Sequence, residues 1–163
     1  MHVKIFTTGG SLDKGYSTRE SDFVVMDPQI RGILQAAGVT LTYEIEPLLR
    51  KDSLEITEED RDLVAEKVRT DPCRHILVTH GTDTLALTGR RLSGIPDKTI
   101  VLTGAMQPAA FKESDAAFNV GFALAALQTL PPGVYLAMNG RIFDPQNVRK
   151  NLELDLFEAE ESP

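Results

Sequence analysis

Side chains that could do chemistry gather in the stretch Thr82-Asp83-Thr84, which follows a histidine and a glycine. A carboxylate between two hydroxyls suits a zwitterionic or amide-bearing small molecule, and a hydroxyl becomes a nucleophile when a neighbour takes its proton. The same residue types are common at helix starts, where Asp83 or Thr84 can cap free backbone N–H groups. From this stretch alone, a binding turn and an ordinary helix cap are both open interpretations.

Three more polar turns each follow a stretch that is expected to be a strand. They are Thr8-Gly9-Gly10-Ser11, Asp52-Ser53 and Gly104-Ala105. Paired glycines let backbone amides approach a ligand closely, but the first turn lacks the Gly-Lys-Ser/Thr of a phosphate-binding P-loop. In a parallel sheet, turns of this kind lie at the carboxyl-terminal edge of the strands. The sequence therefore predicts that the four turns converge on one crevice.

A hydroxyl nucleophile also needs a group that removes its proton. Tyr16 is one candidate, in the polar stretch 14–25, which is either a lid beside the site or a plain exposed loop or hairpin. Lys150 is the other candidate, provided that its surroundings make it a base rather than a solvated surface lysine. The chain has no G-x-S-x-G motif and no recognisable Ser-His-Asp arrangement.

The elements that would hold these residues alternate between strands and helices. Short apolar or alternating runs predict strands over residues 3–7, 40–46, 76–79, 99–102 and 134–138. Helices are predicted over residues 27–37, 57–69, 85–92 and 115–128, with Asp27-Pro28 and Thr57 at the first two helix starts. This order predicts an α/β fold: a doubly wound, mostly parallel sheet with helices on both faces, in a single domain over residues 1–163.

Composition excludes several classes of partner. The net charge of −7 argues against a nucleic-acid or anionic-membrane surface. The lone Cys73 excludes an internal disulfide, and the histidines (His2, His75 and His80) lack the spacing of a metal site, so no metal or cofactor is expected. No stretch resembles a signal peptide or a membrane helix, which favours a cytoplasmic protein.

Taken together, the motifs resemble those of the bacterial-type L-asparaginases. In chain order they are TGGS at 8–11, DS at 52–53, THGTDT at 79–84, TGAM at 103–106 and VRK at 148–150. The resemblance spans nearly the whole chain, and the HGTDT block is highly specific when it follows a TGG-T/S turn at this distance. The sequence is most similar to short-chain members, which contain only the N-terminal domain of the two-domain enzyme.

This resemblance implies hydrolysis of L-asparagine to L-aspartate and ammonia through a covalent acyl-enzyme, without a metal or cofactor. Ser11 occupies the place of the family's nucleophilic threonine, with Tyr16 as the loop tyrosine beside it. Thr82, Asp83 and Lys150 match a second triad, in which a lysine held by a carboxylate activates a hydroxyl or water.

The resemblance also implies how the substrate is held. Ser53 matches the residue that binds the α-carboxylate, Asp83 receives the α-ammonium, and the Ala105 carbonyl holds the leaving carboxamide. Backbone amides near Gly10 and Thr82 could face a developing oxyanion. The implied substrate-binding residues are thus Gly10, Asp52, Ser53, Gly81, Thr82, Asp83 and Ala105.

Several positions depart from the family pattern. Serine replaces threonine at Ser11, Leu87 stands where glutamate is common, and Phe23 could align at the position given to Tyr16. The sequence ends at Pro163, and we expect the second domain to be absent. Since that domain would cover apolar surface and part of the site, we expect a homodimer or homotetramer.

Other functions are compatible with the same turns. One is a glutamine-preferring or amidotransferase-associated amidohydrolase, and another is a catalytically weak module that binds an amino acid. A third is phosphate or nucleotide binding at residues 8–11, which the acidic charge and the missing P-loop disfavour.

Overall fold

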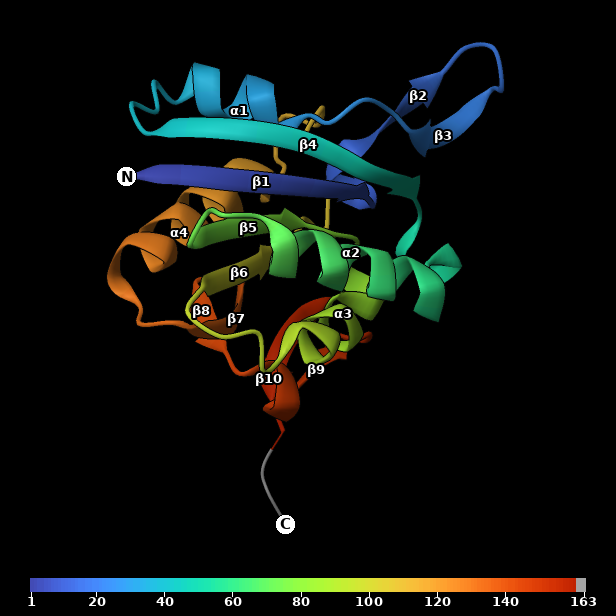
Figure 1. The fold of residues 1–163 in the computed structure, drawn as a ribbon. Helices are drawn as coiled ribbons and strands as arrows, with labels where there is room; N and C mark the ends of the chain where they lie inside the picture. The colour runs from blue at the N-terminus through green and yellow to red at the C-terminus, as the bar shows by residue number, and fades with distance from the viewer. Residues whose placement is uncertain (161–163) are drawn as a thin grey trace.

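A six-stranded sheet forms the centre of the computed structural model, which describes residues 1–160 (Figure 1). The strand order is β4-β1-β5-β6-β7-β8, and all neighbouring pairs except β7–β8 are parallel. The strands are β1 (His2–Gly9), β4 (Thr42–Lys51), β5 (His75–Thr79), β6 (Thr99–Thr103), β7 (Gly133–Met138) and β8 (Arg141–Phe143). The predicted α/β fold with a mostly parallel sheet is therefore confirmed.

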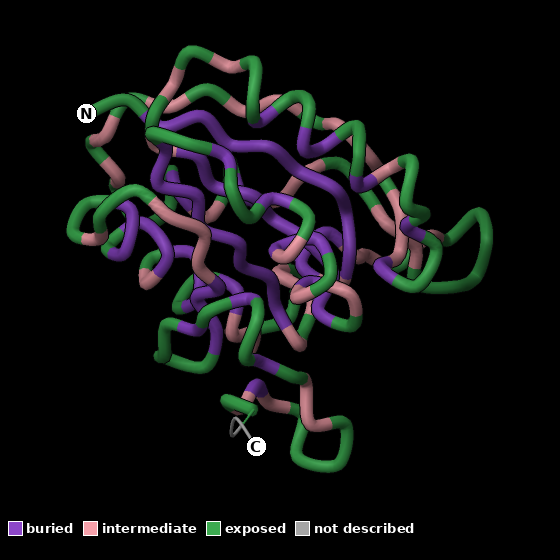
Figure 2. Tube along the Cα trace, turned by 60° about the horizontal axis from the view of Figure 1, so that its bottom comes forward, coloured by how far each residue is buried: buried purple, intermediate pink, exposed green. Residues whose placement is uncertain are grey.

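Helices cover both faces of this sheet. On one face, α2 (Glu58–Thr70) and α3 (Leu85–Leu92) pack against the cluster that contains Ile76 and Val78. On the other face, α1 (Ile30–Ala36) and α4 (Ala116–Thr129) pack against the cluster that contains Leu77. Successive side chains of β5 point to opposite faces, so one apolar strand contributes to both clusters. Figure 2 shows that buried segments (purple) run through the centre of the molecule. None of the helices over residues 1–160 has the length and hydropathy needed to span a bilayer.

Two predicted boundaries differ from the structure by three or more residues. The strand predicted to end at residue 46 continues as β4 through Pro47 to Lys51. A proline is tolerated there because β4 is an edge strand, where a missing N–H breaks no ladder bond on the open side. The helix predicted from Asp27 begins instead at Ile30, because the Asp27 carboxylate pairs with Arg50 rather than capping the helix.

Two small antiparallel sheets lie outside the central sheet. The stretch 14–25 is a hairpin of β2 (Lys14–Ser17) and β3 (Asp22–Val25), which projects past the end of β4 in Figure 1. The second pair is β9 (Val148–Asn151) and β10 (Leu156–Ala159). The sequence patterns did not predict this second pair, which carries Lys150.

The buried carboxyl of Asp13 ties the base of the hairpin to the segment before α1. Asp13 is 1% exposed; its carboxylate accepts the Gln29 N–H at 2.9 Å, and its backbone carbonyl accepts the Met26 N–H at 2.8 Å. Burial raises the pKa of Asp13 to about 6, although the Gln29 N–H and the positive charge of Arg50 act in the opposite direction. A carboxyl of this kind favours the folded state when it is protonated.

Asp13→Asn should therefore change how stability depends on pH. The ordinary pKa of 3.8 rises to about 6 on folding, so the contribution of Asp13 to stability is complete below pH 3.8 and lost as pH rises through 6. This difference in pKa between the folded and unfolded states corresponds to about 3 kcal/mol. Asparagine still accepts the Gln29 N–H and never ionises, so the mutant lacks this pH dependence. Denaturant unfolding between pH 4 and pH 8 measures the free energy of unfolding of both proteins. The value for the mutant minus the value for the wild type should rise with pH up to about pH 7. Contributions from other groups cancel in this difference, and a pH-independent difference would contradict the assignment.

Candidate active site

The four polar turns meet at the carboxyl-terminal edge of the sheet, and glycines make the approach possible. A Cβ added to Gly10 would lie 2.3 Å from the Gly81 Cα, and one added to Gly81 would lie 2.5 Å from the Ser53 Cβ. A Cβ added to Gly104 would lie 2.3 Å from the carbonyl oxygen of His80. Such distances leave no room for any side chain at these positions. The backbones of the four turns are therefore in direct contact.

Lys150 links two residues of the central turn. Its Nζ lies 2.9 Å from the Thr82 Oγ1 and 2.8 Å from the Asp83 Oδ1. The side chains of Lys150 and Asp83 are 13% and 34% exposed, and Thr82 is buried. Lys150 is thus held in the site and is not a solvated surface lysine. In this geometry an amine can exchange a proton with the Thr82 hydroxyl while Asp83 orients it.

The helix-cap interpretation of Asp83 and Thr84 is wrong. Neither side chain caps the helix: they lie in a short 3-10 helix, η3 (Thr82–Thr84), and α3 begins after it without a side-chain cap bond. The Asp83 carboxylate faces Lys150, and the Thr84 Oγ1 donates to the Ser53 carbonyl at 2.8 Å. Both side chains therefore connect turns.

Ser53 is buried and its hydroxyl lies 3.5 Å from the second carboxylate oxygen of Asp83. Asp52 shapes this turn, since its carboxylate caps the 3-10 helix η2 (Ser53–Glu55) by accepting the Leu54 N–H at 3.1 Å. Partial burial acts to raise the pKa of Asp52, but the Lys14 ammonium at 2.6 Å and the Leu54 N–H together hold it below its ordinary value. The Asp52 charge is thus engaged by Lys14, and a donor hydroxyl and a carboxylate lie side by side at Ser53 and Asp83.

Ser11 opens the 3-10 helix η1 (Ser11–Asp13) directly after two glycines with φ of +99° and +80°. Tyr16, by contrast, lies on the hairpin with 56% exposure. Its ring packs edge-on against the Phe23 ring with a centroid distance of 5.7 Å, and the two residues are register partners in the hairpin. The Phe23 ring in turn packs against the Phe111 ring with a centroid distance of 5.5 Å. The structure therefore places both candidates for the loop aromatic side by side and does not bring Tyr16 against Thr82 or Lys150.

The turn at Ala105 is braced by two residues that sequence reasoning missed. The Asn119 side-chain amide donates to the Gly104 carbonyl at 3.0 Å, and the Asp115 carboxylate accepts the Met106 N–H at 3.0 Å. Asp115 also accepts from Asn119 at 2.8 Å. The spacing of four residues between Asp115 and Asn119, which places them on one face of a helix, is the signal that could have indicated this pair.

His80 is the other missed residue. It is buried, its Nδ1 lies 2.8 Å from the Gly81 carbonyl oxygen, and its Nε2 lies 2.8 Å from the Thr88 hydroxyl. A carbonyl can only accept, so Nδ1 carries the hydrogen and Nε2 accepts from Thr88. Burial lowers the pKa of His80 to about 4, with a further decrease from Arg61 and a partial offset from the Gly81 carbonyl. His80 therefore stays neutral near pH 7 and holds the glycine on which the turns meet.

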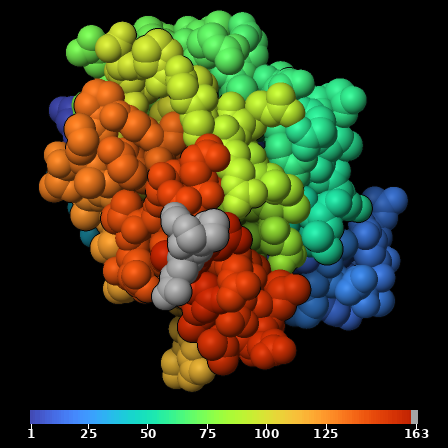
Figure 3. Space-filling model, turned by 90° about the horizontal axis from the view of Figure 1, so that it is seen from below, coloured from blue at the N-terminus to red at the C-terminus, as the bar shows by residue number. Residues whose placement is uncertain are grey.

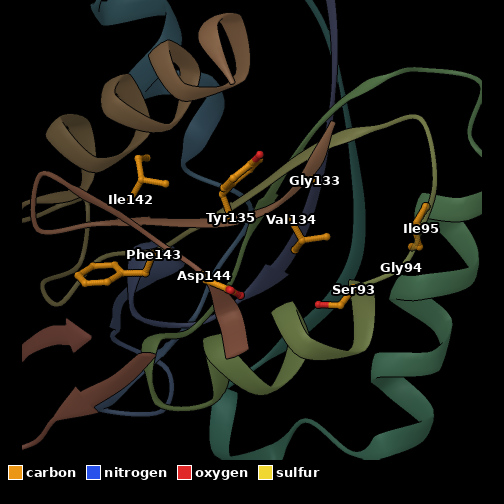
Figure 4. Close-up of a pocket in the computed structure, with 9 residues that line it drawn as sticks. All are labelled: Ser93, Gly94, Ile95, Gly133, Val134, Tyr135, Ile142, Phe143 and Asp144. Atoms are coloured by element: carbon orange, nitrogen blue, oxygen red, sulfur yellow. The ribbon is translucent and has the colours of Figure 1, made fainter. Parts of the chain in front are cut away.

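One hollow on the surface formed by residues 1–160 touches these residues. A hollow of about 530 Å³ is lined by Asp83 and Lys150 together with Leu54, Leu87 and Leu152. A second hollow, of about 410 Å³, lies between the end of α3, the beginning of β7 and β8 (Figure 4). It contains none of the candidate residues, so we place the site at the converging turns. Among residues 1–160 no group of three or more His, Cys, Asp or Glu side chains could hold a metal ion.

Comparison with known families gives a match over almost the whole chain. A family model described as "Asparaginase, N-terminal" matches residues 2–163. The chain is 32% identical over 171 residues to the L-asparaginase of Thermococcus kodakarensis, covering 98% of this chain and 51% of that protein. A glutaminase-asparaginase of Acinetobacter glutaminasificans is 29% identical over 133 residues, covering 78% of this chain and 39% of that protein.

Solved structures agree with these matches. The thermostable L-asparaginase from Thermococcus kodakarensis superposes with a TM-score of 0.86 at 31% identity, covering 100% of this chain and 52% of that chain. A probable cytoplasmic L-asparaginase from Campylobacter jejuni gives a TM-score of 0.79 at 25% identity, covering 97% and 51%. The chain thus spans about half the length of the L-asparaginases it matches.

Proposed function

Because this chain belongs to the asparaginase family, we propose that it hydrolyses L-asparagine to L-aspartate and ammonia. The observation that carries the proposal is the position of Lys150, whose amine bridges Thr82 and Asp83 where the four turns meet. A hydroxyl, an amine and a carboxylate in contact form a proton-transfer unit beside a site for an amino acid.

The proposed reaction has two halves. The Ser11 oxygen bonds to the carboxamide carbon while its proton passes to a base, and the C–N bond then breaks as the nitrogen gains a proton. Ammonia leaves and an aspartyl ester remains on Ser11. Water next adds to the ester carbon and gives up a proton, the bond between that carbon and the Ser11 oxygen breaks as the oxygen regains a proton, and L-aspartate leaves. Tyr16 serves the first half through movement of its hairpin, and the Thr82-Asp83-Lys150 unit activates a hydroxyl or water.

The proposed substrate contacts follow from charge. The Ser53 hydroxyl donates to the α-carboxylate and Asp83 accepts from the α-ammonium, which matches their neighbouring positions. The Ala105 carbonyl accepts from the carboxamide nitrogen. Backbone N–H groups near Gly10, Gly81 and Thr82 face the developing oxyanion. Asp52 contributes by shaping the Ser53 turn.

Ammonia release from purified protein with L-asparagine and with L-glutamine tests this proposal. We expect release from asparagine, unaffected by a metal chelator, and aspartate as the other product. Faster release from glutamine would favour the second candidate, a glutamine-preferring amidohydrolase, which the similarity to a glutaminase-asparaginase supports. Binding of aspartate without release from either amide would support a binding module instead.

We propose a single asparaginase N-terminal-type α/β domain over residues 1–163 that acts on a small molecule and has no nucleic-acid or membrane partner. A cytoplasmic location is consistent with the name of the Campylobacter jejuni relative.

We further propose a homodimer or homotetramer. Leu54 and Leu152 are 75% and 76% exposed, and with Leu87 they surround the hollow at Asp83 and Lys150. The exposed leucines gathered here support the proposal that a second copy covers this surface. Light scattering at several concentrations should give at least twice the mass of one chain. Leu152→Glu should lower the mass, whereas Leu63→Glu, on the exposed side of α2, should not. A fully active monomer would refute the proposal.

A further inference from the structure

The strand that carries Lys150 lies outside the central sheet. β9 pairs with β10 in a separate two-stranded sheet, so the main ladder does not hold Lys150 near Thr82 and Asp83. Figure 3 shows this C-terminal segment (red) beside the segment that contains α3 (yellow-green). The position of the Lys150 amine therefore depends on the burial of Val148 and Phe157 in the core and on the contacts between α3 and the residues just before Lys150.

Ser93, just after α3, accepts from the Gln146 side chain at 3.1 Å, and Arg90 makes two further polar contacts. It lies on α3, and its Nε donates to the Pro145 carbonyl at 2.8 Å while its Nη2 donates to the Val148 carbonyl at 3.2 Å. The two carbonyls lie at either end of the 3-10 helix η4 (Pro145–Asn147), just before Lys150. A planar guanidinium fixes the separation and direction of two acceptors at once, which a single donor cannot do.

Gly89, the residue before Arg90, allows α3 and η4 to approach each other closely. A Cβ added to Gly89 would lie 3.0 Å from the Pro145 Cβ, so the glycine lets η4 lie directly on α3. Within residues 1–160 Arg90 forms no ion pair, whereas the next residue, Arg91, pairs with Glu58 and Asp62 on the surface. The hydrogen bonds of Arg90 are thus directed to the backbone that leads to Lys150.

We propose that Arg90 is a positioning residue that holds β9 so that the Lys150 amine reaches Thr82 and Asp83. The kinetic part of this inference rests on the proposed function. Arg90 connects α3 to the strand that carries Lys150. Because α3 directly follows the Asp83 turn, Arg90 fixes the two segments that carry Asp83 and Lys150 relative to each other.

Arg90→Met keeps the length of the stem and removes both donors. We expect kcat to fall roughly 10- to 100-fold, the effect of displacing a reacting group by about 1 Å, with little change in KM. Arg90→Lys should recover part of this loss because one donor returns. Arg91→Met is the matched control on the same helix and should leave kcat within about twofold. Wild-type kcat in Arg90→Met would overturn the proposal.

A double-mutant comparison separates positioning from general stability. If Arg90 acts through Lys150, adding Arg90→Met to Lys150→Met should lower the residual rate no further. Additive losses would mean that Arg90 acts elsewhere and would overturn the proposal.

Hydrogen exchange of the full chain tests the same inference without activity. In Arg90→Met the amides of residues 146–160 should exchange faster than in Arg91→Met, with the central strands unchanged. Unchanged exchange at 146–160, or faster exchange throughout, would overturn the positioning role. Should Arg90→Met lack a cooperative unfolding transition, Arg90→Lys is measured in the same way. If the wild type releases no ammonia from any amide, the proposed function fails, while this measurement still decides the role of Arg90.

Discussion

Ser11→Ala is expected to abolish ammonia release from L-asparagine, with a loss of roughly 10⁴-fold or more in kcat, as when a nucleophile is removed from other hydrolases. Binding of L-aspartate should persist, because the proposed contacts to the charged ends of the ligand come from Ser53 and Asp83. Steady-state ammonia assays measure the first quantity, and calorimetric titration with L-aspartate measures the second.

Ser11→Thr is the informative companion to this variant. Threonine carries a second substituent on Cβ, which restricts χ1 and pre-sets the direction of the oxygen. Serine must order that rotamer at each attack, at about 0.5–1 kcal/mol, which corresponds to a roughly two- to five-fold slower step. We therefore expect Ser11→Thr to keep or modestly raise kcat where the added methyl is accommodated.

The outcome for Ser11→Ala also decides between two hydroxyls. Substantial remaining activity would mean that Thr82, which already contacts Lys150, is the nucleophile. Thr82→Ala should then abolish the reaction, and Thr82→Ser should restore part of it. The roles proposed for Ser11 and Thr82 would be exchanged.

Lys150→Met should produce the second large effect. Methionine keeps an unbranched stem but removes the amine, so Thr82 loses its proton partner and Asp83 loses its cation. General acid–base groups contribute about 10²- to 10⁴-fold, and we expect kcat to fall by that amount. Aspartate binding should weaken less, since Asp83 and Ser53 remain. Lys112→Met, which changes an exposed lysine of the loop before α4, is the control.

Lys150→Arg distinguishes two explanations of such a loss. Arginine keeps the positive charge beside Asp83 but cannot give up its proton at ordinary pH. If the amine acts as a base, Lys150→Arg should be nearly as inactive as Lys150→Met. Recovery of activity in Lys150→Arg would mean that only the charge matters. Near-normal turnover in Lys150→Met would remove Lys150 from the mechanism altogether.

The sequence by itself determined the arrangement of layers and the place where the turns meet. The apolar run of β5 serves both faces because strand side chains alternate, and the glycines at 10, 81 and 104 stand where backbones touch. Helix starts with a local signal, such as the capping box at Thr57, were likewise predictable. Each of these features depends on residues within a short window of the chain.

Only the tertiary structure decided which side chains lie together in the candidate site. Lys150 lies 68 residues from Thr82 in the chain and 2.9 Å from it in space, on a strand pair that no periodicity predicted. The orientation of Tyr16 depends on its aromatic contact with Phe23, and the start of α1 depends on Asp27 pairing with Arg50. The positioning role proposed for Arg90 can be recognised only once the carbonyls of Pro145 and Val148 are in place. A side-chain direction is set by neighbours distant in sequence, which local pattern does not contain.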